Sequence, residues 1–233
     1  ARSMALVRPE RLETREYSGH KKKVHSVAWS CTGHKLASGS VDQSVRVWSV
    51  DETGRATDTE LKGHQDSVDQ LRWDPSQPEV LGTASGDKTV RIWDARSSKC
   101  AQAIETRGEN INIRWSPDGQ HIAVGDKEDN ISLIEMRKCK TLKNIKFGFE
   151  VNEMAWERTG GLFFLTTGVG TIEVYRYADM VAPGAEASPI TTLHAHTANC
   201  YCIEFSPNGE WFAVGGADAL VSIWSVPELV CVR

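Results

Sequence analysis

The feature that most constrains this fold is a strand-like segment that recurs five times along the 233 residues. Apolar and polar residues alternate in each copy, which is typical of a half-buried β-strand. The copies are SVRVWSV (Ser44–Val50), TVRIWDA (Thr89–Ala95), NISLIEM (Asn130–Met136), TIEVYRY (Thr171–Tyr177) and LVSIWSV (Leu220–Val226). The residues at the Trp position are Trp48, Trp93, Ile134, Tyr175 and Trp224. They follow one another at intervals of 45, 41, 41 and 49 residues. Such regular spacing indicates a repeat architecture.

A second landmark repeats independently at a similar spacing. An earlier strand in each unit ends in an aromatic residue, at Trp29, Trp73, Trp115, Trp156 and Phe205. Turn residues follow, as in 116–119 (SPDG) and 206–209 (SPNG), where Pro presets φ and Gly accepts a positive φ. No segment of the periodic region shows a helical pattern. We therefore predict an all-β fold built of repeated antiparallel units.

Composition narrows the functional class without choosing a function. The chain is 40% hydrophobic and 25% charged, with a net charge of −4, whereas a protein that binds mainly phosphate is usually basic. It has no apolar run of about 18 residues and no N-terminal stretch of signal-peptide type. Its six cysteines are scattered, which favours reduced thiols in the cytosol or nucleus over a disulfide framework.

Paired Gly-His and Trp-Asp landmarks at this period resemble the WD-repeat β-propeller family. The pairs that match run from Gly19-His20 to Trp48, from Gly63-His64 to Trp93-Asp94 and from Ala195-His196 to Trp224. Gly108 and Gly148 open two degenerate units that lack the His. The resemblance implies one propeller domain over residues 12–233, with blades at approximately 18–57, 58–104, 105–144, 145–189 and 190–233. Residues 1–11 are expected to form a tail that begins with a cloning remnant before Met4.

Recurring His, hydroxyl and Asp residues suggest a catalytic triad at first sight. In WD-repeat proteins such sets resemble a structural tetrad, because buried polar groups need partners and a catalyst would not be copied into several blades. The predicted tetrad residues are His20, Ser38, Asp42 and Trp48, then His64, Thr83, Asp87 and Trp93, then His196, Asp218 and Trp224. Val214 replaces the hydroxyl in the fifth unit, while Glu128 and Val169 replace the Asp in the third and fourth. We expect those three blades to be less tightly cross-linked, and we expect no catalysis.

Neither a cofactor site nor a metal site is predicted. The segment 82–89 (GTASGDKT) resembles a phosphate loop, but its glycines are too close and Asp87 separates Gly86 from Lys88. His194, His196, Cys200 and Cys202 suggest zinc ligands. However, His196 fills the repeat position, and Cys200 takes a core position held by Val elsewhere.

In the WD-repeat family, side chains that flank the start of the first strand point to the top rim. Carried over unit by unit, these candidate partner-binding residues are Lys23, His25, Ser67, Asp69, Asn110, Asn112, Glu150, Asn152, Asn199 and Tyr201. The set is polar and mixed in charge, which suits a protein partner. Lys21–Lys23 is a basic run on the same rim and leaves direct RNA contact open as an alternative.

Several less generic segments resemble the THO complex subunit 3 family of WD-repeat proteins. They include GENINIRWSPDGQ (Gly108–Gln120), FEVNEMAW (Phe149–Trp156), AHTANCYCI (Ala195–Ile203) and FAVGGADALVSIW (Phe212–Trp224). This resemblance implies a nuclear, non-catalytic scaffold subunit of the THO/TREX assembly that couples transcription to mRNA processing and export. Its partners would be other THO/TREX subunits, with RNA bound mostly through them, no membrane and no small-molecule substrate. The alternative is a substrate receptor of a cullin-type ubiquitin ligase, because Val90–Arg96 resembles the WD-x-Arg box.

Members of that family carry seven repeats, whereas this chain carries five. We therefore predict five repeats of a seven-blade template, in a ring that is open or incompletely closed, with closure as five blades as the alternative. Leu12–Tyr17 precedes the first Gly-His as Asp58–Lys62 precedes the second. We accordingly expect Leu12–Tyr17 to be an outer strand, which in a closed ring would pair with the final blade.

Overall fold

A computed structural model describes residues 14–51, 53–184 and 186–233, and the predicted tail 1–11 lies outside them. The described residues form five four-stranded sheets, each a simple antiparallel meander, which we call blades one to five. Blades one to three are β1 (Val24–Trp29), β2 (Lys35–Ser40), β3 (Val45–Val50) and β4 (Ala56–Leu61), then β5 (Val68–Trp73), β6 (Val80–Ser85), β7 (Thr89–Asp94) and β8 (Lys99–Glu105), then β9 (Asn110–Trp115), β10 (His121–Asp126), β11 (Asn130–Glu135) and β12 (Lys140–Lys146).

Blade four differs from the others by a short helix inserted before its last strand. Blades four and five are β13 (Val151–Trp156), β14 (Leu162–Thr167), β15 (Thr171–Arg176), α1 (Tyr177–Val181) and β16 (Thr191–His194), then β17 (Cys200–Phe205), β18 (Trp211–Gly216), β19 (Val221–Ser225) and β20 (Val230–Cys231). Met180 anchors α1 in the core that blades three and four share. None of the helices in the described ranges could span a membrane.

The turn between the second and third strands is the same in every blade. One residue of this turn has a positive φ, and glycine holds that position only in blade four: Gln43 (71°), Lys88 (63°), Asp129 (58°), Gly170 (84°) and Ala219 (65°). In blades one, two and five, the Asp just before that residue accepts a hydrogen bond from the backbone N–H two residues further on. A side chain that caps the turn in this way offsets the cost of a left-handed residue.

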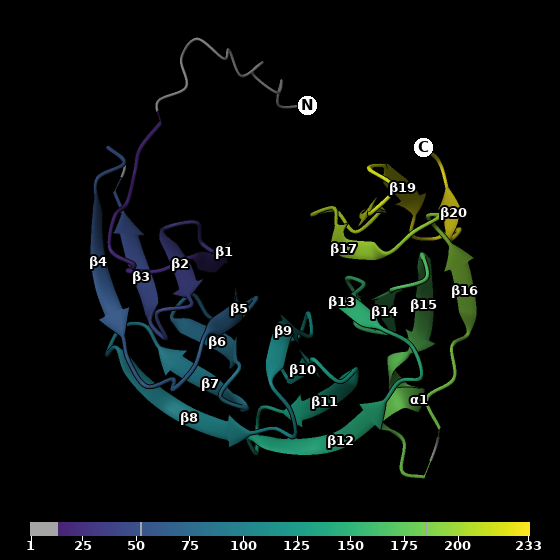
Figure 1. Ribbon diagram of the computed structural model, residues 1–233, viewed down its shortest axis with the longest axis horizontal. Helices are drawn as coiled ribbons and strands as arrows, with labels where there is room; N and C mark the ends of the chain where they lie inside the picture. Colours follow the sequence, from purple (N-terminus) through teal and green to yellow (C-terminus); the bar gives the residue numbers. More distant parts are fainter. Residues whose placement is uncertain (1–13, 52, 185) are drawn as a thin grey trace.

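The blades follow one another along an arc that does not close (Figure 1). The first strands β1, β5, β9, β13 and β17 lie on the inside of the arc, and the fourth strands lie outside. Blade one and blade five stand at opposite ends. The predicted all-β propeller with an open ring is confirmed, and the five-blade closed alternative is not adopted.

The core lies mainly between neighbouring blades rather than inside single sheets. The cluster that joins blades one and two contains Ala37 and Val47 from one sheet and Leu71 and Trp73 from the next. Comparable clusters join blades two and three, three and four, and four and five. Each blade therefore depends on its neighbours for burial of its apolar faces, as repeat proteins do.

All four predicted blade boundaries fall before the end of a fourth strand, and two of them are clearly wrong. The boundary at 57/58 cuts through β4, which pairs with β3 along its whole length from Val45↔Leu61 to Val50↔Ala56. The boundary at 189/190 places β16 in blade five, although β16 pairs with β15 of blade four. The sequence repeat starts at a fourth strand, whereas backbone hydrogen bonding assigns that strand to the preceding sheet.

The outer strand predicted at Leu12–Tyr17 is also not formed where the structure describes it. Leu12 lies outside the described residues, and residues 14–17 are not in a strand. Tyr17 instead packs on its own blade: its ring stacks on Trp48 with 5.7 Å between centroids, and its hydroxyl donates to the Gly54 carbonyl. In the open arc, no strand of blade five lies beside this segment to pair with it.

Candidate partner-binding surfaces

Blades one and two each contain a complete hydrogen-bonded tetrad. In blade two, His64 Nδ1 lies 2.8 Å from Asp87, His64 Nε2 lies 2.7 Å from the Thr83 hydroxyl, and the Trp93 indole donates to that hydroxyl at 2.9 Å. The matching distances in blade one are 3.1 Å for His20–Asp42, 2.7 Å for His20–Ser38 and 3.0 Å for Trp48–Ser38. One chain of polar contacts thus links two strands of the sheet, the turn between them and the loop that enters the blade.

Electrostatics fix the protonation state of the blade-two tetrad. Burial opposes ionisation of Asp87, but hydrogen bonds from Thr89, Gln65 and His64 outweigh it and lower the pKa of Asp87 to about 2. Burial also lowers the pKa of His64, more than the attraction of Asp87 raises it. The imidazole is therefore neutral near pH 7, and its Nδ1–H donates to Asp87 because an ionised carboxylate can only accept.

The pKa of Asp42 in blade one is set by the same opposition of burial and hydrogen bonding. Burial would raise the pKa of Asp42, but the hydroxyl of Ser44, 2.6 Å away, and the backbone N–H of Lys21, 2.7 Å away, donate to its carboxylate. These bonds hold the pKa of Asp42 well below its usual range. Both carboxylates are therefore committed to cross-linking a blade, which suits a structural role.

Blade five corrects a prediction: its tetrad is complete, although Val214 occupies the expected hydroxyl position. The hydroxyl comes instead from Ser222 on β19, which lies 3.0 Å from His196 Nε2 and accepts the Trp224 indole at 2.8 Å. Asp218 lies 2.9 Å from His196 Nδ1. Ser222 precedes Trp224 by two residues, so the two side chains share one face of the strand. This spacing was the signal that the sequence offered.

Blades three and four replace the tetrad with other contacts, and no imidazole enters them from the preceding loop. In blade three, the Asn130 side chain and the Glu128 backbone donate to Asp126. In blade four, the hydroxyls of Thr167 and Thr171 lie 2.8 Å apart. The positions of the missing Trp are filled by buried Ile134 and Tyr175.

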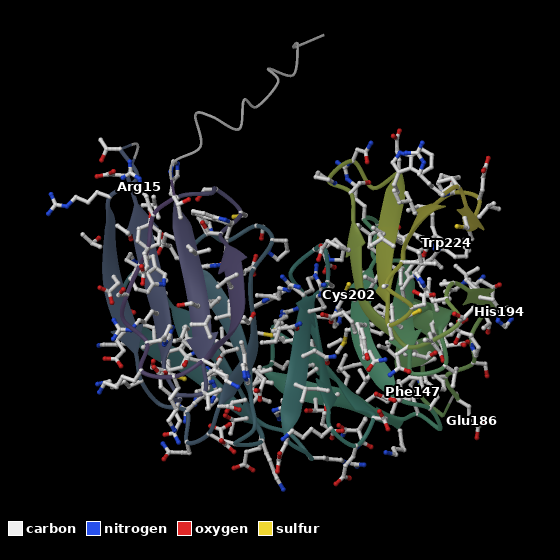
Figure 2. All side chains as sticks on the ribbon, turned by 45° about the horizontal axis from the view of Figure 1, so that its top comes forward. Arg15, Phe147, Glu186, His194, Cys202 and Trp224 are labelled. Carbon is white, nitrogen blue, oxygen red and sulfur yellow. The ribbon has the colours of Figure 1, made fainter. Side chains whose placement is uncertain are left out.

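Two of the four side chains suggested as zinc ligands, Cys200 and His196, belong to the fold, whereas His194 and Cys202 are exposed. Cys200 is fully buried in the core between blades four and five, and burial raises the pKa of its thiol to about 11. His196 belongs to the tetrad, while Cys202 is exposed on the inner side of blade five (Figure 2). The described residues contain no group of three or more potential metal ligands.

The predicted rim residues fall into three groups by exposure. Ser67, Asp69, Asn152 and Asn199 are half-buried. Asn110 and Asn112 are buried. The exposed group consists of Lys23, His25, Glu150 and Tyr201.

The two buried asparagines are a correction, because they are not available to a partner. Asn110 donates to the Thr89 carbonyl and accepts a hydrogen bond from Thr106. Asn112 donates across the joint between blades three and four to the Asn152 carbonyl at 2.9 Å. The side-chain amide of an Asn on a first strand can hydrogen-bond to a neighbouring blade as readily as it can face solvent. The residue type alone does not distinguish these two environments.

Other rim residues are linked across blades. His25 of blade one lies 2.9 Å from Asp69 of blade two, and the Ser67 hydroxyl also donates to Asp69. Sequence reasoning missed an adjacent ion pair between Lys127 and Glu109, although both are charged residues in short turns. That pair, followed by the attraction of Asp69 and Asp66, raises the pKa of Lys127.

Inside the arc, charged side chains connect blades that are not neighbours in sequence. Arg114 of blade three reaches Glu204 of blade five at 3.1 Å, and Arg72 of blade two lies 3.9 Å from the same carboxylate. The Gln70 amide donates to Glu153 of blade four at 2.8 Å. These contacts hold the inner strands of blades two to five together, and the inner surface of the arc is of mixed charge.

Comparison with known proteins agrees with this architecture. The model of the WD domain, G-beta repeat, matches residues 12–49, 56–94 and 187–225, and that of the anaphase-promoting complex subunit 4 WD40 domain matches residues 103–159. THO complex subunit 3 of Arabidopsis thaliana is 55% identical over 95% of this chain and 69% of its own length. The chain belongs to the THO complex subunit 3 family. Its more distant similarity to WD repeat-containing protein AAC3 of Dictyostelium discoideum is 37% identity over 94% of this chain and 50% of that protein.

The segments that resemble the THO complex subunit 3 family most specifically include two in the degenerate blades. The segments that suggested the family, Gly108–Gln120 and Phe149–Trp156, lie on the first strands of blades three and four and the loops that flank them. Similarity to anaphase-promoting complex subunit cdc20 of Dictyostelium discoideum is lower, at 25% identity over 91% of this chain and 34% of that protein.

Proposed function

We propose that this chain is a non-catalytic scaffold subunit of a THO/TREX-type assembly in the nucleus, where it couples transcription to mRNA processing and mRNA export. The observation that carries the proposal is the 55% identity to THO complex subunit 3 over 95% of the chain. In this proposal the chain acts through protein–protein contacts, and RNA is bound mostly through its partners.

The chemistry of the blades supports a scaffold over an enzyme. The His, hydroxyl and Asp groups that resemble a triad hydrogen-bond to an indole or to backbone N–H groups. A catalytic Ser or Thr needs a free path to a substrate carbonyl, whereas the Thr83 hydroxyl is fully buried. These groups serve as cross-links, and the exposed rim is left to serve the partners.

We further propose that the four exposed rim residues Lys23, His25, Glu150 and Tyr201 contact a partner subunit. Tyr201 is the best anchor, because the residue is 57% exposed and a Tyr can bury a large apolar area while its hydroxyl stays hydrogen-bonded. Asp69 supports this surface by holding His25 in place.

Affinity capture from nuclease-treated nuclear extract, with the bound proteins identified by mass spectrometry, tests the proposed function. Recovery of THO subunits after nuclease treatment is the expected result, because the contacts are between proteins. Recovery of a cullin adaptor without THO subunits would overturn it and favour the ligase-receptor alternative. The motif behind that alternative ends at exposed Arg96, whose backbone N–H donates to Asp94 at the end of β7. Loss of THO subunits on nuclease treatment would mean that RNA forms the link.

A further inference from the structure

The outer strand of blade three is strongly basic. This strand, β12, and the turn before it span residues 137–146, which carry five cationic side chains and no carboxylate in a chain whose net charge is −4. The outer strands of blades one and two contain acids, with Asp58 and Glu60 on β4 and Glu105 on β8. β12 lies on the convex side of the arc, opposite the gap between blades one and five (Figure 1). Neither end of the arc therefore contributes to its surroundings.

Several of these cations have no ionic partner in the described part of the chain. On β4, both carboxylates are paired with an arginine of β3. On blade three, Lys138 pairs with Glu135 at 3.1 Å. Exposed Arg137, Lys140 and Lys146 form no ion pair with any described residue. A row of unpaired cations raises the local positive potential, which favours a partner that carries carboxylates.

β12 also presents an open backbone edge. It is the last strand of its sheet and pairs with β11 on one side, so alternate N–H and C=O groups on its other side point away from the sheet. A bulge skips Leu142 and puts Lys140 and Lys143 on the same face. That face is directed toward blade four, because Leu133, opposite Lys143, lies in the core that blades three and four share. Lys146 lies on the other face, so a strand added here would meet lysines on both faces.

A hollow beside β12 adds apolar surface. It has a volume of about 470 Å³ and lies between β12 and the segment that precedes β16. Lys143 and Lys146 line it together with one carboxylate, that of Glu186. Its apolar lining comes from Ile145, Phe149, Tyr175, Ala187 and Pro189. The side chains of a strand laid along β12 gain apolar contacts here that the phosphate groups of RNA cannot make.

We propose that β12 is a docking site for an extended acidic segment of another protein, which adds to blade three as a fifth strand. Backbone hydrogen bonds to the open edge supply affinity, and carboxylates opposite Lys140 and Lys146 supply specificity. The apolar hollow and the net negative charge of the chain favour a protein segment over RNA.

This docking site goes beyond the proposed function, because capture of THO subunits through the rim does not require it. Leu142→Asp separates the two, since it places a carboxylate on β12 at a position that is 46% exposed. It should weaken the binding of an acidic segment by charge repulsion and leave the capture of THO subunits unchanged. Failure of one proposal therefore leaves the other standing.

A synthetic peptide is the probe for the test. It has seven residues, the length of β12, alternates glutamate with valine, and carries a fluorescein label whose anisotropy reports binding. Lys140→Glu combined with Lys146→Glu reverses two exposed charges of β12. The matched control, Lys62→Glu combined with Lys99→Glu, makes the same change in net charge at exposed lysines of blades one and two. Circular dichroism and thermal unfolding confirm that each variant is folded.

The wild type and the control are expected to bind the peptide equally, and the charge-reversed variant at least about tenfold more weakly. The same peptide methylated at every backbone nitrogen should not bind, because it keeps its carboxylates but cannot donate to the strand edge. No binding by the wild type, equal binding by the charge-reversed variant, or equal binding of the methylated peptide would overturn the proposal. A labelled oligouridylate that binds in place of the peptide, and is lost on charge reversal, would overturn it in favour of an RNA contact.

Discussion

A single hydroxyl joins an imidazole to an indole in each of the three tetrads. Thr83 connects His64 and Trp93, while Ser38 and Ser222 do the same in blades one and five. Because these groups are buried, each must find a partner within the blade or leave a costly unsatisfied polar atom. The tetrad thus cross-links the blade through several hydrogen bonds that depend on one another.

Replacing the hydroxyl of blade two should therefore destabilise the fold. Thr83→Val removes the acceptor of the Trp93 indole and the partner of His64 Nε2, and we expect a loss of about 2–3 kcal/mol in the free energy of unfolding. Thr83→Ser keeps the hydroxyl and should lose less than about 1 kcal/mol. Urea unfolding followed by circular dichroism measures both, and equal losses would show that the hydroxyl contributes nothing.

The protonation states in blade two predict a loss of stability in acid. The pKa of His64 is lowered by burial, so the unfolded chain binds a proton more readily and stability falls as the pH drops below 6.5. The pKa of Asp87 is about 2 in the folded chain, so its contribution is complete above 3.8 and is lost as the pH falls from there toward 2.

Urea unfolding at several pH values between about 7.5 and 5 tests the histidine part of this prediction. His64→Gln should flatten the dependence of stability on pH, while the matched change at exposed His34, His34→Gln, should not. Stability that rises as the wild type is acidified would mean that the folded chain prefers the charged imidazole.

At residue level the sequence located the complete tetrads but not every partner. Blades one and two follow the repeat position by position, so the resemblance to WD-repeat proteins identified His20 and His64 with their hydroxyls. Ser222 was missed because it replaces Val214 from the neighbouring strand, a relation that exists only once the sheet is paired. The burial of Asn110 and Asn112 depends on the adjacent blade, so no local pattern could reveal it.

At the level of the element, contact with the preceding blade determines whether the apolar face of a first strand is buried. Trp73 is buried against blade one and bonded to the Ala28 carbonyl, whereas Trp29 occupies the same position in its own blade and is exposed. The repeat pattern therefore predicted both strands correctly. It is the same for both strands and so gave no sign that one Trp is buried and the other exposed. The blade boundaries at β4 and β16 were misplaced for a related reason. Backbone hydrogen bonds between strands, and not the repeat motif, decide to which blade an outer strand belongs.

A matched pair of substitutions measures what the joint contributes. Trp73→Phe keeps an aromatic ring and removes the donor to Ala28, and we expect a loss of about 1–2 kcal/mol in the free energy of unfolding. Trp29→Phe makes the same chemical change at an exposed site and should cost less than about 0.5 kcal/mol. Equal losses would indicate that the position matters within its own sheet and not across the joint.

At the scale of the whole molecule, the chain is an open arc of five blades in the THO complex subunit 3 family. Its polar chemistry lies in cross-links within blades, and its apolar surface lies at the two ends. The rim is the surface that we propose for partners, and Lys23, His25, Glu150 and Tyr201 are its exposed members. In our proposal, this rim recognises other subunits of the assembly.

The most direct test is capture of THO subunits by the wild type, a rim variant and a control variant from the same nuclease-treated extract. The rim variant carries Glu150→Lys and Tyr201→Ala, and the control carries Leu142→Asp on the outer edge of blade three. We expect the rim variant to capture at least about tenfold less of the THO subunits while unfolding like the wild type, and the control to capture as much as the wild type. Undiminished capture by a folded rim variant would contradict it.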